Sequence, residues 1–342
     1  MLFTLDQLHA VKTLVCHGPA CPDGIASAIL LHDVLPDAEV KFVQYQTPEQ
    51  LELPATTGML FCDFSPHPDR TQRFVDVGAI VLDHHKTAKD VVAAFGPLGA
   101  FGDEKADPGV CGAVLAYRHV WLPIKQAQYK AAVAASHDGG NDAGYLYEGQ
   151  FYRAEKFAGV AGVRDTWLNQ DPRWEEAVIQ AEALRFYPIE HWLSLKEPFR
   201  FENEHWWTER KKLGEILIQR HGASCKRAIE KAWRFTSKNG TRVIMFEGTA
   251  QSSDAAELLD KEVDLVIGFG FVVEGGIPKM IFSMRSHTGY DCSTFAKRFG
   301  GGGHTAAAGF NAPIKQSPYD FAELLVNDHE HQAENPKKDS PQ

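Results

Sequence analysis

Short apolar runs alternate with helical stretches over roughly the first quarter of the chain. Apolar runs at residues 11–16, 39–45, 58–62 and 79–82 predict β-strands, and residues 24–35 carry apolar side chains at helical spacing. Strands that alternate with helices are typical of βαβ units and a parallel sheet. In such a sheet, polar residues that follow the strands meet at one edge, which is where ligands bind.

A second α/β pattern follows a long helical region. Helices are expected at 109–121, 125–136 and 153–164, and residues 173–235 are rich in helix-forming residues. The second pattern consists of strands at 241–248, 263–272 and 279–286 with helices at 252–262 and 291–299.

The length of 342 residues indicates two domains, because single cores stop growing near ~250–300 residues. We expect an α/β protein with a parallel-sheet domain over residues 1–170 and a smaller α/β domain over residues 239–327. A helical connector at 171–238 would join them. The polar residues 328–342 predict a disordered tail.

The composition is that of an ordinary soluble protein, with 44% hydrophobic and 23% charged residues. A net charge of −10 excludes an indiscriminate polyanion binder. Six cysteines are scattered without a Cys-x-x-Cys pair, which favours reduced thiols and a cytoplasmic location. The sequence shows no signal peptide and no membrane span, so we expect no membrane partner, and a homodimer is left open.

Side chains with metal-binding chemistry follow three of the predicted strands. They are His17, with Cys21 and Asp23 in the next turn, then Asp63, and then the triplet Asp83, His84 and His85; Asp165 follows a later helix. Imidazole and carboxylate groups bind Mn, Fe, Zn or Mg, and several carboxylates in one place stay ionised only beside a cation. Two divalent ions about 3.5–4 Å apart suit phosphoryl displacement by an activated water.

Each of these residues also has a simpler interpretation. A single aspartate after a strand, such as Asp23 or Asp63, is more often a helix cap or a turn former. A cysteine such as Cys21 is more often a small buried apolar residue. The convergence of three strand ends is what favours a metal site.

A glycine run, Gly300–Gly303, precedes His304 and forms the second signal. Glycines let the backbone approach a ligand closely, and a helix N-terminus after the run would offer N–H groups to phosphate. Arg285 and Ser286 close the preceding strand, and arginine suits bidentate phosphate contacts. The alternative is a flexible loop.

Together these motifs resemble the DHH phosphoesterase superfamily with its DHH-associated C-terminal domain. The triplet Asp83-His84-His85 matches the motif that names the family, and His17-x3-Cys21-x-Asp23-Gly24 matches its first motif. Asp63 matches the second motif, and Asp165 in VRDTW best matches the fourth, with Asp138 in SHDGGND competing for that place. Arg285-Ser286, the glycine run with His304, and Ala307-Ala308-Gly309 match the C-terminal signature.

The resemblance implies roles for these residues. It implies a two-metal site, usually of manganese, with Mg²⁺, Zn²⁺ or Fe²⁺ as alternatives, held by His17, Asp23, Asp63, His84 and Asp165. Asp63 would bridge the ions, His85 would face the scissile phosphate, and Asp83 would orient the histidine pair. The implied substrate-binding residues, in a cleft between the domains, are Arg285, Ser286, Gly301, Gly302, Gly303 and His304.

One departure concerns Cys21, which stands where many family members carry a carboxylate. A thiolate ligand there would favour softer ions such as Zn or Fe. The resemblance implies hydrolysis of short oligonucleotides or linear dinucleotides to mononucleotides. The alternatives are polyphosphate, pyrophosphate or nucleoside 3′,5′-bisphosphate hydrolysis, and a nucleotide-sensing protein with a degraded metal site.

Overall fold

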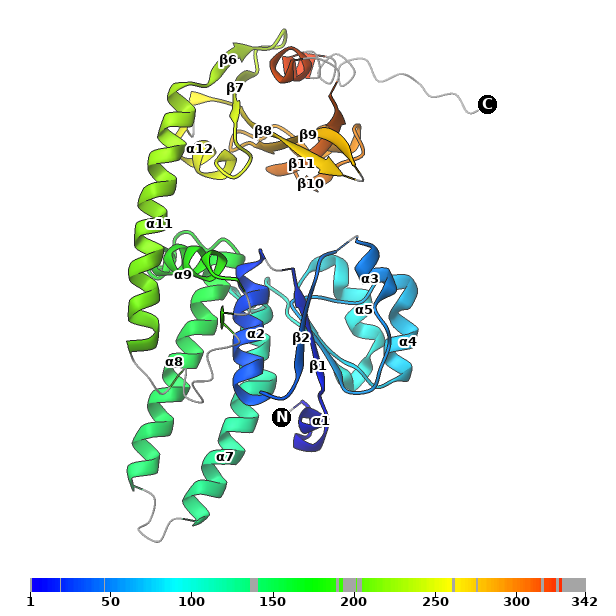
Figure 1. Ribbon diagram of the computed structural model, residues 1–342, viewed down its shortest axis with the longest axis vertical. Helices are drawn as coiled ribbons and strands as arrows, with labels where there is room; N and C mark the ends of the chain where they lie inside the picture. The colour runs from blue at the N-terminus through cyan, green and yellow to red at the C-terminus, as the bar shows by residue number, and fades with distance from the viewer. Residues whose placement is uncertain are drawn as a thin grey trace. The chain divides into compact units, whose positions relative to one another are not determined.

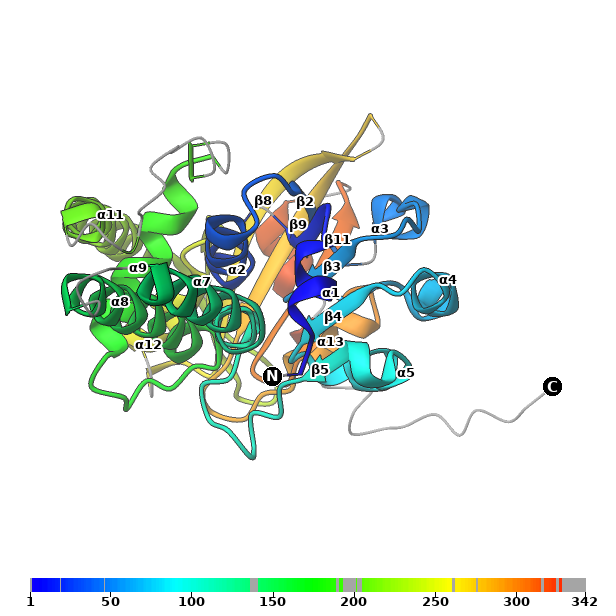
Figure 2. The ribbon, with the colours of Figure 1, turned by 90° about the horizontal axis from the view of Figure 1, so that it is seen from below.

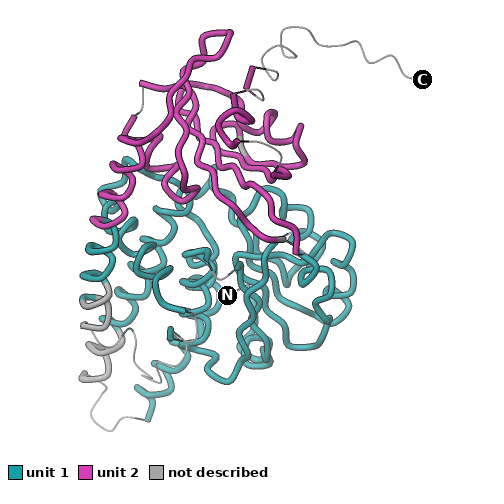
Figure 3. Tube along the Cα trace, turned by 45° about the horizontal axis from the view of Figure 1, so that its top comes forward, with its two compact units in different colours: residues 1–218 teal, residues 219–342 magenta. Residues whose placement is uncertain are grey.

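The protein divides into two compact units, residues Met1–Ile218 and Gln219–Gln342 (Figure 3). The computed structural model describes residues 2–18, 20–45, 47–135, 141–188, 191–192, 201, 205–259, 262–274, 276–314, 317–323 and 326–327. Within these ranges, the side chains of 141–147, 205–207, 209–210, 274 and 304 are not described. Asp138 and the predicted tail at 328–342 lie outside the described residues. Helix α11 (His205–Glu230) runs across the division between the units.

The first unit is built on a five-stranded parallel sheet in the order β2-β1-β3-β4-β5. Its strands are β1 (Thr13–His17), β2 (Glu39–Val43), β3 (Met59–Cys62), β4 (Ile80–Asp83) and β5 (Gly99–Phe101). Figure 1 labels the strands β1 and β2. All neighbouring strands pair in parallel, so the predicted parallel sheet is confirmed.

Successive side chains of these strands enter two different cores. Leu14 and Cys16 belong to one cluster of buried apolar residues, and Val15 belongs to a second cluster. Both faces of the sheet are covered (Figure 2). On one side lies α2 (Pro22–Val34), and on the other lie α3 (Pro48–Glu52), α4 (Thr71–Asp76) and α5 (Lys89–Ala94). This is why the strands appear in the sequence as continuous apolar runs.

The helices of the first unit lie between and after the strands. They are α1 (Leu5–His9), α2 (Pro22–Val34), α3 (Pro48–Glu52), α4 (Thr71–Asp76), α5 (Lys89–Ala94), α6 (Gly112–Ala116), α7 (Leu122–Ala135), α8 (Asn141–Asp165) and α9 (Trp174–Phe186). A π-helical turn at Tyr117–Trp121 joins α6 to α7, so one helical run replaces the two helices expected at 109–121 and 125–136. Pro123 follows this turn, and the helix continues through it. None of the described helices is long and apolar enough to span a bilayer.

The second unit contains a six-stranded sheet in the order β10-β11-β9-β8-β7-β6. Its elements are β6 (Trp233–Thr236), β7 (Arg242–Glu247), α12 (Ser252–Leu259), β8 (Leu265–Glu274), β9 (Ile277–Arg285), α13 (Cys292–Lys297), β10 (Gly302–His304) and β11 (Ala307–Pro313). Among these strands, only β7 and β8 pair in parallel. Both faces of this sheet are also buried, because the neighbouring residues Val243 and Ile244 belong to different clusters of buried apolar residues. The predicted two-domain α/β fold is therefore confirmed.

Two local expectations in this unit are wrong. Residues 233–236, expected to be helical, form the edge strand β6, whose partner β7 overrides the local helix propensity. The glycine run enters the hairpin β10–β11, so no helix N-terminus follows it. A Cβ on Gly303 would lie 2.4 Å from the backbone oxygen of Ala307, and the hairpin therefore requires glycine there.

Candidate metal centre

Three adjacent strands place the predicted ligands at one edge of the sheet. His17 ends β1, Asp63 directly follows β3, and Asp83 ends β4, and these strands are neighbours in the sheet. Asp63 has a φ of 57°, a left-handed conformation that is uncommon for residues other than glycine. Backbone strain of this kind is concentrated at functional sites.

His17, Cys21 and Asp63 form the first group of candidate ligands. His17 Nδ1 lies 3.5 Å from Asp63 Oδ2, and the Cys21 thiol donates to the same oxygen at 3.4 Å. His17 Nδ1 is buried and has no hydrogen-bond partner within the described part of the chain. A buried ring nitrogen without a hydrogen-bond partner is free to bind a cation, and the nearby carboxylate can bind the same cation.

Asp23, His84 and Asp165 form the second group. His84 Nε2 lies 3.2 Å from Asp63 Oδ1, 3.3 Å from Asp165 Oδ2 and 3.7 Å from Asp23 Oδ2. The structure thus brings together, around one side chain, residues from α2, α8 and the ends of two strands. Asp165, the preferred candidate for the fourth motif, is one of these residues; its competitor Asp138 lies outside the described part of the chain.

Glu104, which the sequence analysis did not select, holds the other nitrogen of His84. Its Oε1 lies 3.2 Å from His84 Nδ1. Burial lowers the pKa of His84, but the hydrogen bond to Asp63 and the charges of the aspartates outweigh burial and raise this pKa to about 10.

Asp83 is fully occupied by hydrogen bonds. It accepts from the hydroxyls of Tyr45 and Ser65, from the backbone N–H groups of His84 and His85, and from His85 Nδ1 at 2.8 Å. Burial opposes ionisation of Asp83, but the His85 hydrogen bond and charge prevail and lower its pKa. Asp83 is therefore placed to orient His85 rather than to bind a cation.

The side chain of Asp23, from α2, forms hydrogen bonds with the first residues of α6. Its carboxylate accepts from the N–H groups of Gly112 at 2.6 Å and Ala113 at 2.9 Å, and from the Cys111 thiol at 2.9 Å. A Cβ on Gly112 would lie 2.3 Å from the Cβ of Asp63, so only glycine fits between the two carboxylates.

The electrostatics of the centre call for a cation. Burial and the charge of Asp63 raise the pKa of both Asp23 and Asp165. For Asp63, burial is outweighed by His17 and His84, which lower its pKa. Three carboxylates at such distances ionise together only if positive charge is supplied. The donor set of imidazoles, carboxylates and one thiol fits divalent metal ions.

Comparison with known proteins gives one family match, which lies within the second unit. Residues 245–326 match the family model of the DHHA1 domain. The second unit is therefore similar to the DHHA1 domain over these residues. With the strand-end motifs of the first unit, this match confirms the resemblance to the DHH superfamily with its DHH-associated domain. No curated protein sequence matches the chain.

Several solved structures are similar to the chain at low identity. The chain is similar to the DHH domain of a member of a ribosomal protein family, with a TM-score of 0.55, 11% identity and coverage of 94% of this chain and 87% of the other. Exonuclease RecJ bound to manganese has a TM-score of 0.49, 17% identity and coverage of 99% and 98%. A pGpG-specific phosphodiesterase from Vibrio cholerae has a TM-score of 0.43, 14% identity and coverage of 93% and 99%.

The second unit places the remaining predicted residues around the end of β9. Arg285 donates to the hydroxyls of Ser253 and Ser283, and burial lowers its pKa. The buried hydroxyl of Ser286 accepts from the N–H groups of Thr288 and Tyr290, which makes it part of the turn. Gly301 precedes β10, Gly302 and Gly303 lie in it, and the side chain of His304 is not described.

Proposed function

We propose that the protein is a divalent-metal-dependent phosphoesterase that hydrolyses phosphodiester bonds in short oligonucleotides or linear dinucleotides to mononucleotides. The observation that carries this proposal is the cluster of overlapping donor groups around Asp63, which is buried at the carboxyl edge of a parallel sheet. Besides the two groups described above, Asp63, His84 and His85 form a third. Buried carboxylates and imidazoles in this number are difficult to explain without cations.

The two donor groups would hold one cation each. His17, Cys21 and Asp63 would form one site, and Asp23, His84 and Asp165 the other, with Asp63 shared. We propose manganese as the ion. When bound, such ions activate a water and neutralise charge on the attacked phosphate.

His85 is the residue best placed to contact the substrate. Nδ1 of His85 is hydrogen-bonded to Asp83, and the His85 side chain is 32% exposed. Its Nε2 is therefore the ring nitrogen that can contact a phosphate oxygen. Because Asp83 ends β4 two residues before His85 and is itself fixed by Tyr45 and Ser65, the ring is oriented before substrate binds.

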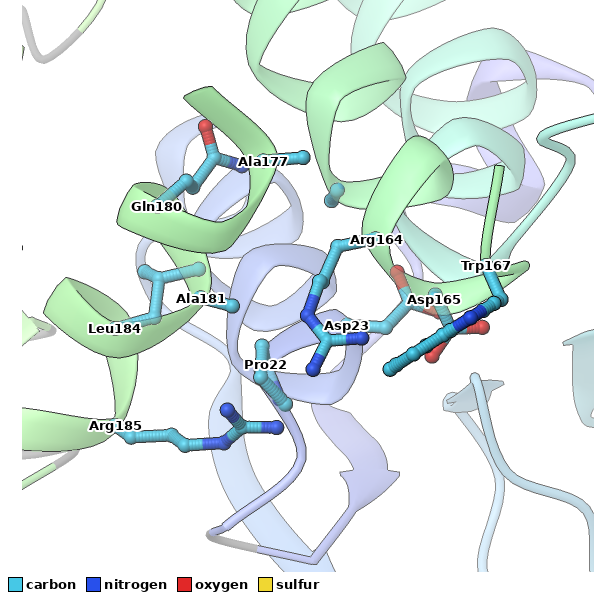
Figure 4. Close-up of a pocket in the computed structure, with 11 residues that line it drawn as sticks. Pro22, Asp23, Arg164, Asp165, Trp167, Ala177, Gln180, Ala181, Leu184 and Arg185 are labelled. Atoms are coloured by element: carbon cyan, nitrogen blue, oxygen red, sulfur yellow. The ribbon is translucent and has the colours of Figure 1, made fainter. Parts of the chain in front are cut away.

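The substrate class is supported by the motif set and by a pocket beside the ligands. Asp23 and Asp165 line this pocket together with Arg164 and Arg185 (Figure 4). Guanidinium groups suit a second phosphate near the reacting one. A net charge of −10 argues against long single strands as the main substrate, since extended polyanions need many cationic contacts. Six free cysteines favour a reducing compartment such as the cytoplasm.

Hydrolysis of a 5′-labelled RNA series, from dimer to about 24-mer, in Mn²⁺ tests the proposal. We expect mononucleotide release that is fastest from the shortest members and is lost in Asp63→Ala. Glu52→Gln, on the exposed surface of α3, serves as the control for loss of an acidic charge. Turnover of polyphosphate or a 3′,5′-bisphosphate in place of RNA would reassign the substrate. Failure to bind Mn²⁺ and to hydrolyse any of them would contradict the metal-dependent activity.

A further inference from the structure

The end of helix α8 carries a tryptophan where glycine is usual. The Leu168 N–H donates to the carbonyl of Val163 at 3.0 Å, and the Trp167 N–H donates to the carbonyl of Arg164 at 3.4 Å. These two bonds define a Schellman motif, in which the residue after the helix cap is left-handed. Trp167 holds this position with a φ of 57°. For a bulky side chain this conformation is an outlier.

Burial does not account for this choice of residue. Trp167 remains 42% exposed, so its ring is not anchored in a core. The Arg164 guanidinium lies 4.4 Å from the ring centre, and the ring of Trp174 meets it at 5.1 Å with an interplanar angle of 70°. These contacts fix the indole in place and leave much of its surface open to solvent.

The fixed indole lies beside the candidate metal centre. Trp167 follows Asp165 by two residues, and it lines the same pocket as Asp165, Asp23 and Arg185 (Figure 4). In this view the Trp167 ring lies next to Asp165, and the guanidinium groups of Arg164 and Arg185 both reach towards Pro22. An open aromatic surface therefore stands next to ligands of the proposed cations.

We propose that Trp167 is a stacking platform for a nucleobase of the substrate. This rests on the proposed function, because the scissile phosphate at Asp23 and Asp165 is what brings a base to the indole. Stacking accepts any base, since every base has a π-face. Arg164 behind the ring adds a cation–π contact that holds the platform rigid. Trp167 thus selects nucleotides over phosphates that carry no base.

The test measures kcat/KM for two substrates, a dinucleotide and the same dinucleotide with one nucleoside replaced by an abasic sugar. Both are assayed with Trp167→Gly, Trp167→Phe and the unchanged protein. Trp167→Gly should lower kcat/KM about tenfold more for the base-bearing substrate than for the abasic one. Trp167→Phe should keep most of the discrimination. Because glycine suits the left-handed position, Trp167→Gly should melt at the same temperature or higher.

Two outcomes would overturn the proposal. One is a Trp167→Gly variant with lower thermal stability and equal losses on both substrates, which would make the tryptophan a structural residue. The other is unchanged discrimination. If the unchanged protein cleaves neither substrate, the proposed activity fails, and the platform is tested by calorimetric binding of both molecules in Ca²⁺. Equal loss of affinity for both in Trp167→Gly, or no loss, would then reject it.

Discussion

Glu104 Oε1 lies 3.2 Å from Nδ1 of His84, and this contact leaves Nε2 of the same ring facing three aspartates. A histidine that binds a metal usually has its second nitrogen held by a carboxylate or carbonyl, which fixes the tautomer and the ring orientation. Glu104 supplies this contact. The His84 side chain is 4% exposed, whereas the side chain of Glu104 is 39% exposed.

Glu104→Gln should therefore weaken binding of the cation at Asp23, His84 and Asp165. Loss of such a partner typically costs about 10–100-fold in metal affinity. Calorimetric titration with Mn²⁺ measures the effect. Glu52→Gln removes the same charge from the exposed end of α3 and should bind Mn²⁺ as the unchanged protein does. Equal affinities for the two variants would show that Glu104 does not support the site.

Asp83→Asn should separate orientation from metal binding. Asp83 accepts from four groups besides its contact with His85 Nδ1, so its role is to fix that ring. We expect kcat to fall about 100-fold, because a misplaced His85 no longer stabilises the charge that develops on the phosphate, while Mn²⁺ content stays the same. Metal analysis and steady-state kinetics on a dinucleotide check both parts. Loss of metal in Asp83→Asn, but not in Asp76→Asn on the surface of α4, would make Asp83 part of the metal site.

Much of the first unit could be predicted because burial on both faces leaves a simple pattern. The runs ending at Cys16, Cys62 and Leu82 became β1, β3 and β4, with ends shifted by about one residue. The rule that strand ends meet at one edge then predicts that His17, Asp63 and Asp83 lie close together. Long-range contacts, by contrast, left no local pattern, as the strand at Trp233–Thr236 shows.

Glu104 escaped prediction for a related reason. It follows β5, a strand of three residues that is too short to show a period. Had Gly99–Phe101 been recognised as the fifth strand, the same edge rule would have pointed to Gly102-Asp103-Glu104. Cys111 and Gly112 are different, because their contacts with Asp23 join parts of the chain that no spacing connects.

Cys21→Asp should change which metal the protein prefers. Burial and the charge of Asp63 raise the pKa of the Cys21 thiol, so it loses its proton only when a cation replaces that proton. Thiolates favour Zn²⁺ over Mn²⁺. We expect Cys21→Asp to lower the preference for Zn²⁺ by about tenfold, or ~1.4 kcal/mol. Metal analysis after dialysis against equal concentrations of both ions measures this preference. Cys225→Ala, in the second unit, should leave the ratio unchanged; an unchanged ratio in Cys21→Asp would exclude the thiol as a ligand.

Asp291 should make the stability of the second unit depend on pH in a defined window. Its side chain caps α13 by accepting from the N–H of Thr294 at 3.0 Å and from the hydroxyls of Ser293 and Thr294. The Thr294 N–H bond is the main reason that its pKa is lowered to about 2. A carboxylate with a lowered pKa stabilises the folded state fully above its unfolded pKa near 3.9, and loses this contribution as pH falls towards 2.

Asp291→Ala should accordingly cost ~1 kcal/mol at pH 7, the usual value of an N-cap. The difference from the unchanged protein should persist down to pH 5 and shrink as pH falls below about 4. Hydrogen exchange of backbone amides in β8, β9 and β11, followed at pH 7, 5, 4 and 3, reports the second unit separately from the first. Asp320→Ala removes an exposed carboxylate for which we expect no capping role, and its exchange should match the unchanged protein throughout. A difference for Asp291→Ala that stays constant down to pH 3 would mean that the capping bond does not depend on the charge.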